Sequence, residues 1–448
     1  MKYKKKPKKV FNDIMNKMQI KKSTKNKKKL KFMKKEKGKN KKRLYSKKKI
    51  NKAIDKKNII KKIFYIVILI LFYLFCPKNI ISNSLYNLFY NKKRVGVVCI
   101  EVTQNVGNIL VKYSMFKKLE ELGFNVTIIS PGKFGKKELS FINNTFNPNL
   151  FLINKNFSEE LNESDFDYLI VNSDQTWAYG ISRYYFDIAF LRFAKNWSKV
   201  KKFVYAASIG SDKLDFRILR SKEIIKELIS NFTGISFREI GTVKLFEEKM
   251  GINGLFVLDP TLIIDKQYYL NEIKDYKGNF TSNEKFMFVY QLDRNYIINR
   301  FIEDSSKKLN YKVFKFQFSR SDVIENFIFG ITNSQCVITD SFHGTVFSII
   351  FNKPFISFVN KARGKARFDS LQETFNLYDR IIDPLSRRNI DINLLINKPN
   401  INQTILNQLR SLSLNYLKKI WIYFNFYIFK IIIFIVYYFY LIIYKFKL

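Results

Sequence analysis

Short apolar runs alternate with longer amphipathic segments through the middle of the chain, which is the pattern of an α/β fold. Residues 94–100 are predicted to form a buried strand. Apolar residues recur at helical spacing over 109–122, which predicts a helix that ends before Gly123. A second strand is predicted at 125–129. This order indicates a βαβ unit whose Asn/Gly-rich loop lies at the carboxyl end of its first strand.

The same alternation continues and predicts a second α/β set after an Asn/Gly/Ser-rich linker at 277–284. We therefore expect two Rossmann-like, doubly wound parallel sheets, in domains 94–275 and 285–395, with ligand sites at the carboxyl ends of their strands. The further strands are expected at 168–171, 202–206, 286–290, 311–315 and 336–339, and the strongest helices at 221–230 and 241–250.

Two apolar segments flank this body. The first, within 63–90, is wholly apolar over 63–76 and stops at Pro77, so it is shorter than the ~20 residues that a spanning helix needs. The second, 418–448, is long enough to span but contains Lys430, which makes an interfacial or hairpin placement an alternative. Either placement predicts that the body is held at a membrane.

The positive charge of the chain is concentrated at its start. The formal net charge is +43, and residues 1–62 carry 29 Lys and Arg against three acids. Such a segment is too self-repelling to pack, so a disordered leader is expected. Attachment to anionic lipid and a general compositional drift towards Lys and Asn are equally good readings, whereas nucleic-acid binding is disfavoured because few aromatic residues interleave the lysines.

The cysteines give no sign of a metal site. Cys76, Cys99 and Cys336 all lie in apolar runs without metal-ligand spacing. They are expected to be buried thiols in a reducing compartment, and no metal requirement is predicted.

The chain contains one histidine, His343, directly after the apolar run 336–338. It therefore stands where a strand ends and a helix begins, which is where α/β folds bind anions and carry out chemistry. The plainer alternative is a hydrogen-bonded histidine that caps this helix.

Six short segments lie in order over about 94–395. They are Asn105–Asn108, Asp167–Trp177, Tyr205–Gly210, Ser236–Glu239, Asp259–Thr261, and Thr339–Ser348 with Phe351–Phe355. Together they resemble the polysaccharide pyruvyl transferase family. The resemblance implies two Rossmann-like domains in a GT-B arrangement and the transfer of pyruvate from phosphoenolpyruvate to two hydroxyls of a sugar as a ketal. Two positions depart from the pattern: Ser341 stands where some members have Arg, and Asn108 where many have Asp.

The resemblance implies roles for individual residues. An unperturbed imidazole titrates at ~6.5, so His343 is the expected general acid. Arg can bind phosphate and carboxylate in bidentate geometry. Arg238 and Arg367 are the stronger candidates for binding the donor, and Arg363 and Arg380 are weaker ones. The expected donor-binding residues are Arg238, Arg367, Ser341, Gly344 and Thr345, and the amides of 342–345 are expected to cradle phosphate.

Two further groups are expected to complete the cleft. The first is a loop on the amino-terminal side, for which simple turn chemistry is an equal alternative. The second is expected to bind the acceptor sugar. The alternatives are that Trp177 packs in the core and that Asp174 caps a helix. The loop residues are Asn105, Gly107 and Asn108, and the acceptor residues are Asp174, Gln175 and Trp177.

The leading hypothesis is thus a membrane-associated pyruvyltransferase acting on a glycan or lipid-linked sugar, with phosphoenolpyruvate as co-substrate and no cofactor. A GT-B glycosyltransferase with a nucleotide-sugar donor and a non-catalytic, membrane-tethered sugar-binding protein are the alternatives. If both apolar segments crossed the membrane once with the leader inside, the body would lie away from cytosolic phosphoenolpyruvate. A body on the cytoplasmic face is therefore expected, and a luminal body fed by a donor transporter is the alternative.

Overall fold

The computed structural model describes residues 93–100, 105–131, 141, 150–153, 157–178, 185–214, 222–278, 284–318, 323–386 and 389–419. The chain divides into two units, 1–92 and 93–448, and all of these residues belong to the second. The predicted leader and the apolar segment 63–90 lie outside the described residues. Of the segment 418–448, only Lys418 and Lys419 are described.

The first sheet has seven strands in the order β3-β2-β1-β4-β5-β6-β7, and every pairing in it is parallel. The inner strands are buried over almost their whole length, because helices cover both faces of such a sheet. The strands are β1 (Arg94–Val98), β2 (Asn125–Pro131), β3 (Leu150–Ile153), β4 (Tyr168–Val171), β5 (Lys201–Ala207), β6 (Gly234–Phe237) and β7 (Leu255–Phe256).

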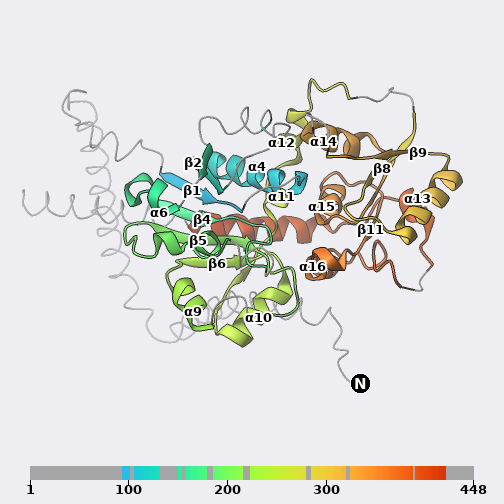
Figure 1. Cartoon of the computed structure of the whole chain (residues 1–448). Helices are drawn as coiled ribbons and strands as arrows, with labels where there is room; N and C mark the ends of the chain where they lie inside the picture. Colours follow the sequence, from blue (N-terminus) through green and yellow to red (C-terminus); the bar gives the residue numbers. More distant parts are fainter. Residues whose placement is uncertain are drawn as a thin grey trace, which may run out of the picture. The chain divides into compact units, whose positions relative to one another are not determined.

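The second sheet has five parallel strands in the order β12-β11-β10-β8-β9. Figure 1 shows it beyond the first sheet, in yellow to orange. These two sheets confirm the prediction of two parallel α/β layers. The strands are β8 (Phe286–Tyr290), β9 (Lys312–Lys315), β10 (Cys336–Thr339), β11 (Phe355–Phe358) and β12 (Ile381–Ile382).

Helices connect the strands of both sheets. Among those described, α4 (Val106–Glu121) follows β1, and α15 (Phe342–Ile350) follows β10. The others are α6 (Phe157–Glu160), α8 (Phe186–Ala189), α9 (Lys222–Ser230), α10 (Ile240–Met250), α11 (Pro260–Ile263), α12 (Lys266–Glu272), α13 (Tyr296–Leu309), α14 (Val323–Asn333) and α16 (Lys365–Phe375).

Both sheets reverse their strand order at a defined point. The chain builds β2 and β3 on one side of β1 and then places β4 on the other; in the second sheet, β9 and β10 flank β8 in the same way. Ligands of doubly wound folds bind at the carboxyl ends of the strands beside such a switch point. The topology therefore directs attention to the residues that follow β1, β4, β8 and β10.

One apolar cluster joins the two sheets. It includes Val95 and Tyr269 from the first sheet region and Phe288 and Phe347 from the second, and the Tyr269 and Phe347 rings pack with centroids 4.9 Å apart. Tyr269 lies on α12, and its ring also packs with that of Tyr113 on α4, with centroids 5.9 Å apart, so α12 contacts both α4 and α15. The starts of α4 and α15 meet at Gly107 and His343.

A final helix, 403–419, returns to the first sheet, beside β5 in Figure 1. Tyr416 donates to the carbonyl of Val204 at 2.7 Å, and the amide of Leu258 donates to Ser413 at 2.9 Å. The sequence pattern assigned this helix to neither domain. Over the described part of the chain, no helix combines the length and the apolar character needed to cross a membrane.

Candidate active site at the carboxyl ends of both sheets

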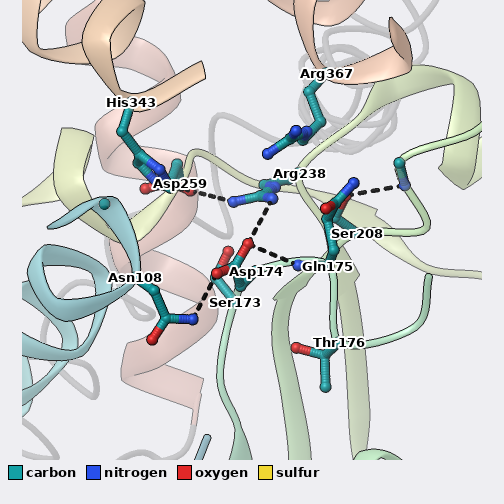
Figure 2. A network of polar contacts seen from close by, with 12 residues as sticks. Asn108, Ser173, Asp174, Gln175, Thr176, Ser208, Arg238, Asp259, His343 and Arg367 are labelled. Carbon is teal, nitrogen blue, oxygen red and sulfur yellow. Dashed lines mark hydrogen bonds and ion pairs between the residues drawn. The ribbon is translucent and has the colours of Figure 1, made fainter. Parts of the chain in front are cut away.

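Five charged or titratable side chains from both sheets meet at one buried place (Figure 2). Asp174 follows β4, Arg238 follows β6 and Asp259 follows β7, while His343 starts α15 and Arg367 lies in the first turn of α16. All five are buried. Because each follows a strand or opens a helix at the same edge, the parallel topology alone brings them together.

Arg238 is the centre of this cluster. Its Nη1 lies 2.7 Å from Asp259 Oδ2, its Nη2 lies 3.3 Å from Asp174 Oδ1, and its Nε lies 3.3 Å from Glu239 Oε1. Burial acts against its charge, but Asp259, Asp174 and Glu239 outweigh burial and raise the pKa of Arg238. The planar guanidinium presents five N–H donors in a fixed geometry. This residue, expected from the sequence to bind the donor, therefore first of all holds three carboxylates in place.

Asp174 has a strained backbone and two fixed oxygens. Its φ of 113° is rare for a residue other than glycine, and such strain costs about 1–3 kcal/mol and is typical of functional sites. Oδ1 accepts from the amide of Gln175 at 2.8 Å, and Oδ2 accepts from Asn108 Nδ2 at 2.6 Å. Burial opposes ionisation, but Arg238 holds the pKa of Asp174 below its usual value.

His343 points toward Asp259 in Figure 2. Its Nε2 lies 3.8 Å from Asp259 Oδ2, which is too long for a hydrogen bond, and this buried nitrogen has no hydrogen-bond partner. Burial would raise the pKa of Asp259, but His343 and Arg238 beside it hold that pKa well below the usual range. This buried imidazole nitrogen is therefore available to bond to a ligand.

The close approach of α4 to His343 depends on Gly107. A Cβ at this position would lie 2.0 Å from His343 Nδ1, so any other residue would displace the imidazole. Asn105 caps α4 by accepting from the amides of Gly107 at 3.0 Å and Asn108 at 3.3 Å. The predicted cleft loop is thus the start of α4. This helix begins three residues earlier than the apolar periodicity indicated, because the capping residue Asn105 determines where it starts.

Arg367 is a buried cation next to another cation. Its Nη2 donates to the carbonyl of Arg363, but its Nε is buried without a partner. Burial and the repulsion of Arg238 lower the pKa of Arg367 to about 10. Arg238 and Arg367 also both contact the ring of Phe342, with Cζ atoms 4.8 and 5.2 Å from its centroid.

Three of these residues carry a buried polar atom without a partner: Asn108 Oδ1, His343 Nε2 and Arg367 Nε. Leaving such an atom unsatisfied costs roughly 1–3 kcal/mol. They come from three different helices, and they comprise an acceptor, a ring nitrogen and a donor. A ligand with both anionic oxygens and hydroxyls would satisfy them.

The start of α15 differs from the expectation that its amides cradle phosphate. The amide of Gly344 donates to the Ser341 hydroxyl at 3.4 Å, and the Thr345 hydroxyl bonds to Ser357 at 2.6 Å. A Cβ at Gly344 would lie 2.3 Å from Thr339 Oγ1. These contacts give Ser341, Gly344 and Thr345 a structural role in the helix start, so Arg367 is the better placed anion-binding group.

A cavity of about 420 Å³ lies beside the cluster and takes its walls from both sheets. Gln175 lines it and donates from Nε2 to the carbonyl of Arg363 at 2.9 Å, across to the second sheet. Its other walls include Gly210, Asp212, Lys361, Gly364, Lys365 and Asp369.

Trp177 does not line this cavity. It is 3% exposed, stacks on Phe190 and Phe246, and donates from Nε1 to the carbonyl of Ala189 at 2.8 Å. The expected sugar-stacking role is therefore corrected to packing in the core. Arg380, a weaker donor candidate, is likewise used internally, because its Nη1 and Nη2 donate to backbone carbonyls.

Sequence reasoning assigned no role to Asp259 or Glu239. Both lie in short segments that carried the family resemblance, but nothing in the sequence shows that they converge on one arginine. Glu239 is fully buried, and burial raises its pKa. The available signal was position, because Glu239 comes shortly after the end of β6 and Asp259 shortly after the end of β7. In the part of the chain that the structure describes, no His, Cys, Asp and Glu side chains gather in a group suited to a metal ion.

Two parallel sheets that share one buried cluster of imidazole, guanidinium and carboxylate groups define an α/β fold with a candidate active site between the sheets. A family model described as polysaccharide pyruvyl transferase matches residues 105–362, more than half of the chain. The chain therefore belongs to the polysaccharide pyruvyl transferase family and is a transferase, as its sequence motifs predicted. The matched span includes His343, Arg238 and Asp259.

Solved structures with a similar chain path include the UDP-GlcNAc 2-epimerase of Neisseria meningitidis bound to UDP-GlcNAc, with 9% identity, coverage of 73% of this chain and 100% of that chain, and a TM-score of 0.46. The ADP-heptose LPS heptosyltransferase II of E. coli has 9% identity, coverage of 72% and 99%, and a TM-score of 0.30. UGT89C1 of Arabidopsis thaliana has 9% identity, coverage of 72% and 95%, and a TM-score of 0.42. A search of curated proteins gave no match.

Proposed function

We propose that the chain transfers pyruvate from phosphoenolpyruvate to two hydroxyls of a glycan or lipid-linked sugar as a ketal, with His343 as the general acid. The observation that carries this proposal is the unpartnered, buried Nε2 of His343, 3.8 Å from Asp259 and beside two arginines. Family membership supports the transferase class and the polysaccharide acceptor. The donor and the role of His343 are the proposal.

The chemistry needs one acid and one anion site. His343 donates a proton to the methylene carbon of the enol phosphate, and C2 gains cation character that one sugar hydroxyl attacks. The bond between C2 and the phosphate oxygen then breaks, and the second hydroxyl closes the ketal. Of the two hydroxyl protons, one returns to the imidazole and one leaves with phosphate, so no proton is gained or lost overall.

Arg367 is the proposed anion site for the donor. Its unpartnered Nε and its repulsion by Arg238 both favour a bound anion, and phosphate or carboxylate accepts from a guanidinium in bidentate geometry. Asp259 faces the imidazole, with its Oδ2 3.8 Å from Nε2. Arg238 keeps Asp259 and Asp174 ionised and in place.

The acceptor sugar occupies the neighbouring cavity of about 420 Å³ in this proposal. Asn108 Oδ1 lacks a partner and can accept from a sugar hydroxyl, while its Nδ2 is held by Asp174. A GT-B-like pair of domains would bind donor and acceptor from opposite sides of this cleft.

The body belongs on the cytoplasmic face of a membrane in this proposal, because phosphoenolpyruvate is available there. Protease digestion of intact vesicles tests that placement.

The test uses the full-length chain with phosphoenolpyruvate and a panel of glycans and lipid-linked sugars. Phosphate release coupled to a new ketal on the sugar is the expected result, and His343→Gln should lower the rate by roughly 10²–10⁴-fold. Thr176→Val serves as the control, because Thr176 is buried beside the site but bonds only to the carbonyl of Asn172. Release of nucleotide from nucleotide sugars, with no phosphate from phosphoenolpyruvate, would overturn the proposal.

A further inference from the structure

A polar network outside the buried cluster links the start of α15 to Arg367. Asp340, which directly precedes the cap residue of α15, accepts from the amides of Leu292 at 2.6 Å and Asp293 at 3.1 Å. It also accepts from Asn360 Nδ2 at 3.1 Å. The loop after β8 and the segment after β11 are thus tied to the residue at the end of β10.

The segment 360–364 is held by a second carboxylate. Asp293 Oδ2 accepts from Asn360 Nδ2 at 2.6 Å. The two oxygens of Asp293 bind Arg363 in bidentate geometry, with Nε at 2.7 Å and Nη2 at 2.9 Å. Arg363 lowers the pKa of Asp293, and this hydrogen-bonded carboxylate in turn raises the pKa of Arg363.

The carbonyl of Arg363 is where the network reaches the site. It accepts from Gln175 Nε2 of the first sheet region and from Arg367 Nη2 of the second. Gly210 and Gly364 have positive φ values of 66° and 109°, and a Cβ on them would lie 2.2 and 2.6 Å from Gln175 Nε2. Both sheets therefore close on Gln175 with room for glycine only, next to the cavity that Gln175 and Gly364 line.

We propose that Asp293 and Arg363 are positioning residues that make the segment 360–364 a latch between the two sheets. The bidentate pair orients the Arg363 carbonyl, which aims Arg367 at the donor and, through Gln175, couples donor binding to closure of the cleft. This inference rests on the proposed function, because it assigns Arg367 to the anionic group of phosphoenolpyruvate.

The exposure of the pair makes the latch testable. The side chains of Arg363 and Asp293 are 44% and 47% exposed, so their ion pair contributes little to global stability. Removing it should leave the chain folded while it releases the carbonyl that orients Arg367. A merely structural pair would give the opposite pattern, with a change in stability and none in donor binding.

The experiment compares Asp293→Ala and Gln175→Ala with Asp383→Ala in the full-length chain. Asp383 is the matched control, because it pairs with Lys361 of the same segment, has a 35% exposed side chain and does not touch Arg363. We expect Asp293→Ala to raise KM for phosphoenolpyruvate and Kd for inorganic phosphate by about tenfold with a smaller change in kcat. Asp293→Asn keeps one carbonyl oxygen, so its KM and Kd should lie between those of wild type and Asp293→Ala. In the Asp293→Ala/Gln175→Ala double variant, the fold-change in KM should be smaller than the product of the two single fold-changes.

Unchanged KM and Kd in Asp293→Ala, or an equal loss in Asp383→Ala, would overturn the latch. If the wild-type chain neither binds nor consumes phosphoenolpyruvate, the proposed function fails separately, and amide hydrogen exchange then decides the latch. The amides of 363 and 364, which bond to carbonyls within the segment, should exchange faster in Asp293→Ala and Gln175→Ala than in Asp383→Ala. Equal exchange in all three would refute the coupling itself.

Discussion

Replacing Gly107 by Ala tests whether the position of His343 is set by α4. The added Cβ would lie 2.0 Å from Nδ1, 2.4 Å from Cγ and 2.8 Å from Cβ of His343. Unbonded heavy atoms pack at about 3.5 Å, so the ring must move by about 1.5 Å. A misplacement of about 1 Å can cost 10²-fold in rate, so we expect kcat/KM to fall by at least about 10²-fold.

The same substitution should have a small effect on stability. Forcing a methyl group into a packed site costs about 1–3 kcal/mol, but Ala is better than Gly in a helix by up to about 1 kcal/mol. The matched control is Gly241→Ala. Gly107 and Gly241 are each the second residue of a helix, and a Cβ on Gly241 meets nothing within 4 Å. The control should keep wild-type activity and be as stable as wild type or more stable by up to about 1 kcal/mol.

Two measurements check this prediction. Phosphate release reports the rate, and NMR of the untagged chain labelled at histidine reports a single imidazole, because the sequence contains one His. The imidazole resonances should shift in Gly107→Ala and stay unchanged in Gly241→Ala. Wild-type turnover in Gly107→Ala together with an unshifted imidazole would refute the argument that α4 positions His343.

Three further substitutions separate structural from chemical roles. Trp177→Phe removes the bond to the Ala189 carbonyl and should lower the free energy of unfolding by about 1–3 kcal/mol, while KM for the acceptor stays constant; denaturant titration and kinetics check both. Arg238→Lys leaves buried carboxylates unpaired and should cost roughly 3–5 kcal/mol, so a melting temperature close to wild type would contradict the three-carboxylate role. The folded-state pKa of Asp259 lies below its unfolded value. The stability that this residue contributes is therefore present above pH ~4 and is lost as pH falls towards the folded pKa. In urea unfolding between pH 3 and 6, the free energy of unfolding should depend less steeply on pH in Asp259→Asn than in wild type.

The fold could be predicted from the sequence because parallel strands buried on both faces give continuous apolar runs. Val95–Val98, Leu169–Val171 and Val337–Thr339 are each buried throughout, and each stands out against polar flanks. Helix starts were less accessible. The pattern placed the first helix at Ile109, whereas Asn105 caps it, because a polar cap leaves no trace in hydrophobic periodicity.

The site was predictable in part. Position at a strand end singled out His343, and the family resemblance added Arg238 and Asp174. The topology of parallel sheets brings those strand ends together. Position could not show which way a side chain points. Trp177 follows β4 as closely as Asp174 does, but it enters the core while Asp174 enters the cluster.

The contacts that organise the site also lie far apart in the sequence. Asp174, Arg238 and Asp259 come from three strands of one sheet, and Gln175 bonds to a backbone carbonyl 188 positions away. A backbone acceptor carries no side-chain signature, so the latch between the sheets was invisible in the sequence. Glycines at 210 and 364 were the accessible trace of this closure, because their positive φ values and the nearby amide of Gln175 leave room for no side chain.

The charge of the cluster constrains how a donor can bind. Two guanidiniums, Arg238 and Arg367, face three carboxylates, Asp174, Glu239 and Asp259. Net charge therefore does not attract a donor that carries both phosphate and carboxylate. The orientation of individual groups can attract it instead. Arg238 is paired with the carboxylates, whereas Arg367 keeps a buried N–H without a partner. The added negative charge of such a donor also favours protonation of Glu239, whose pKa burial raises.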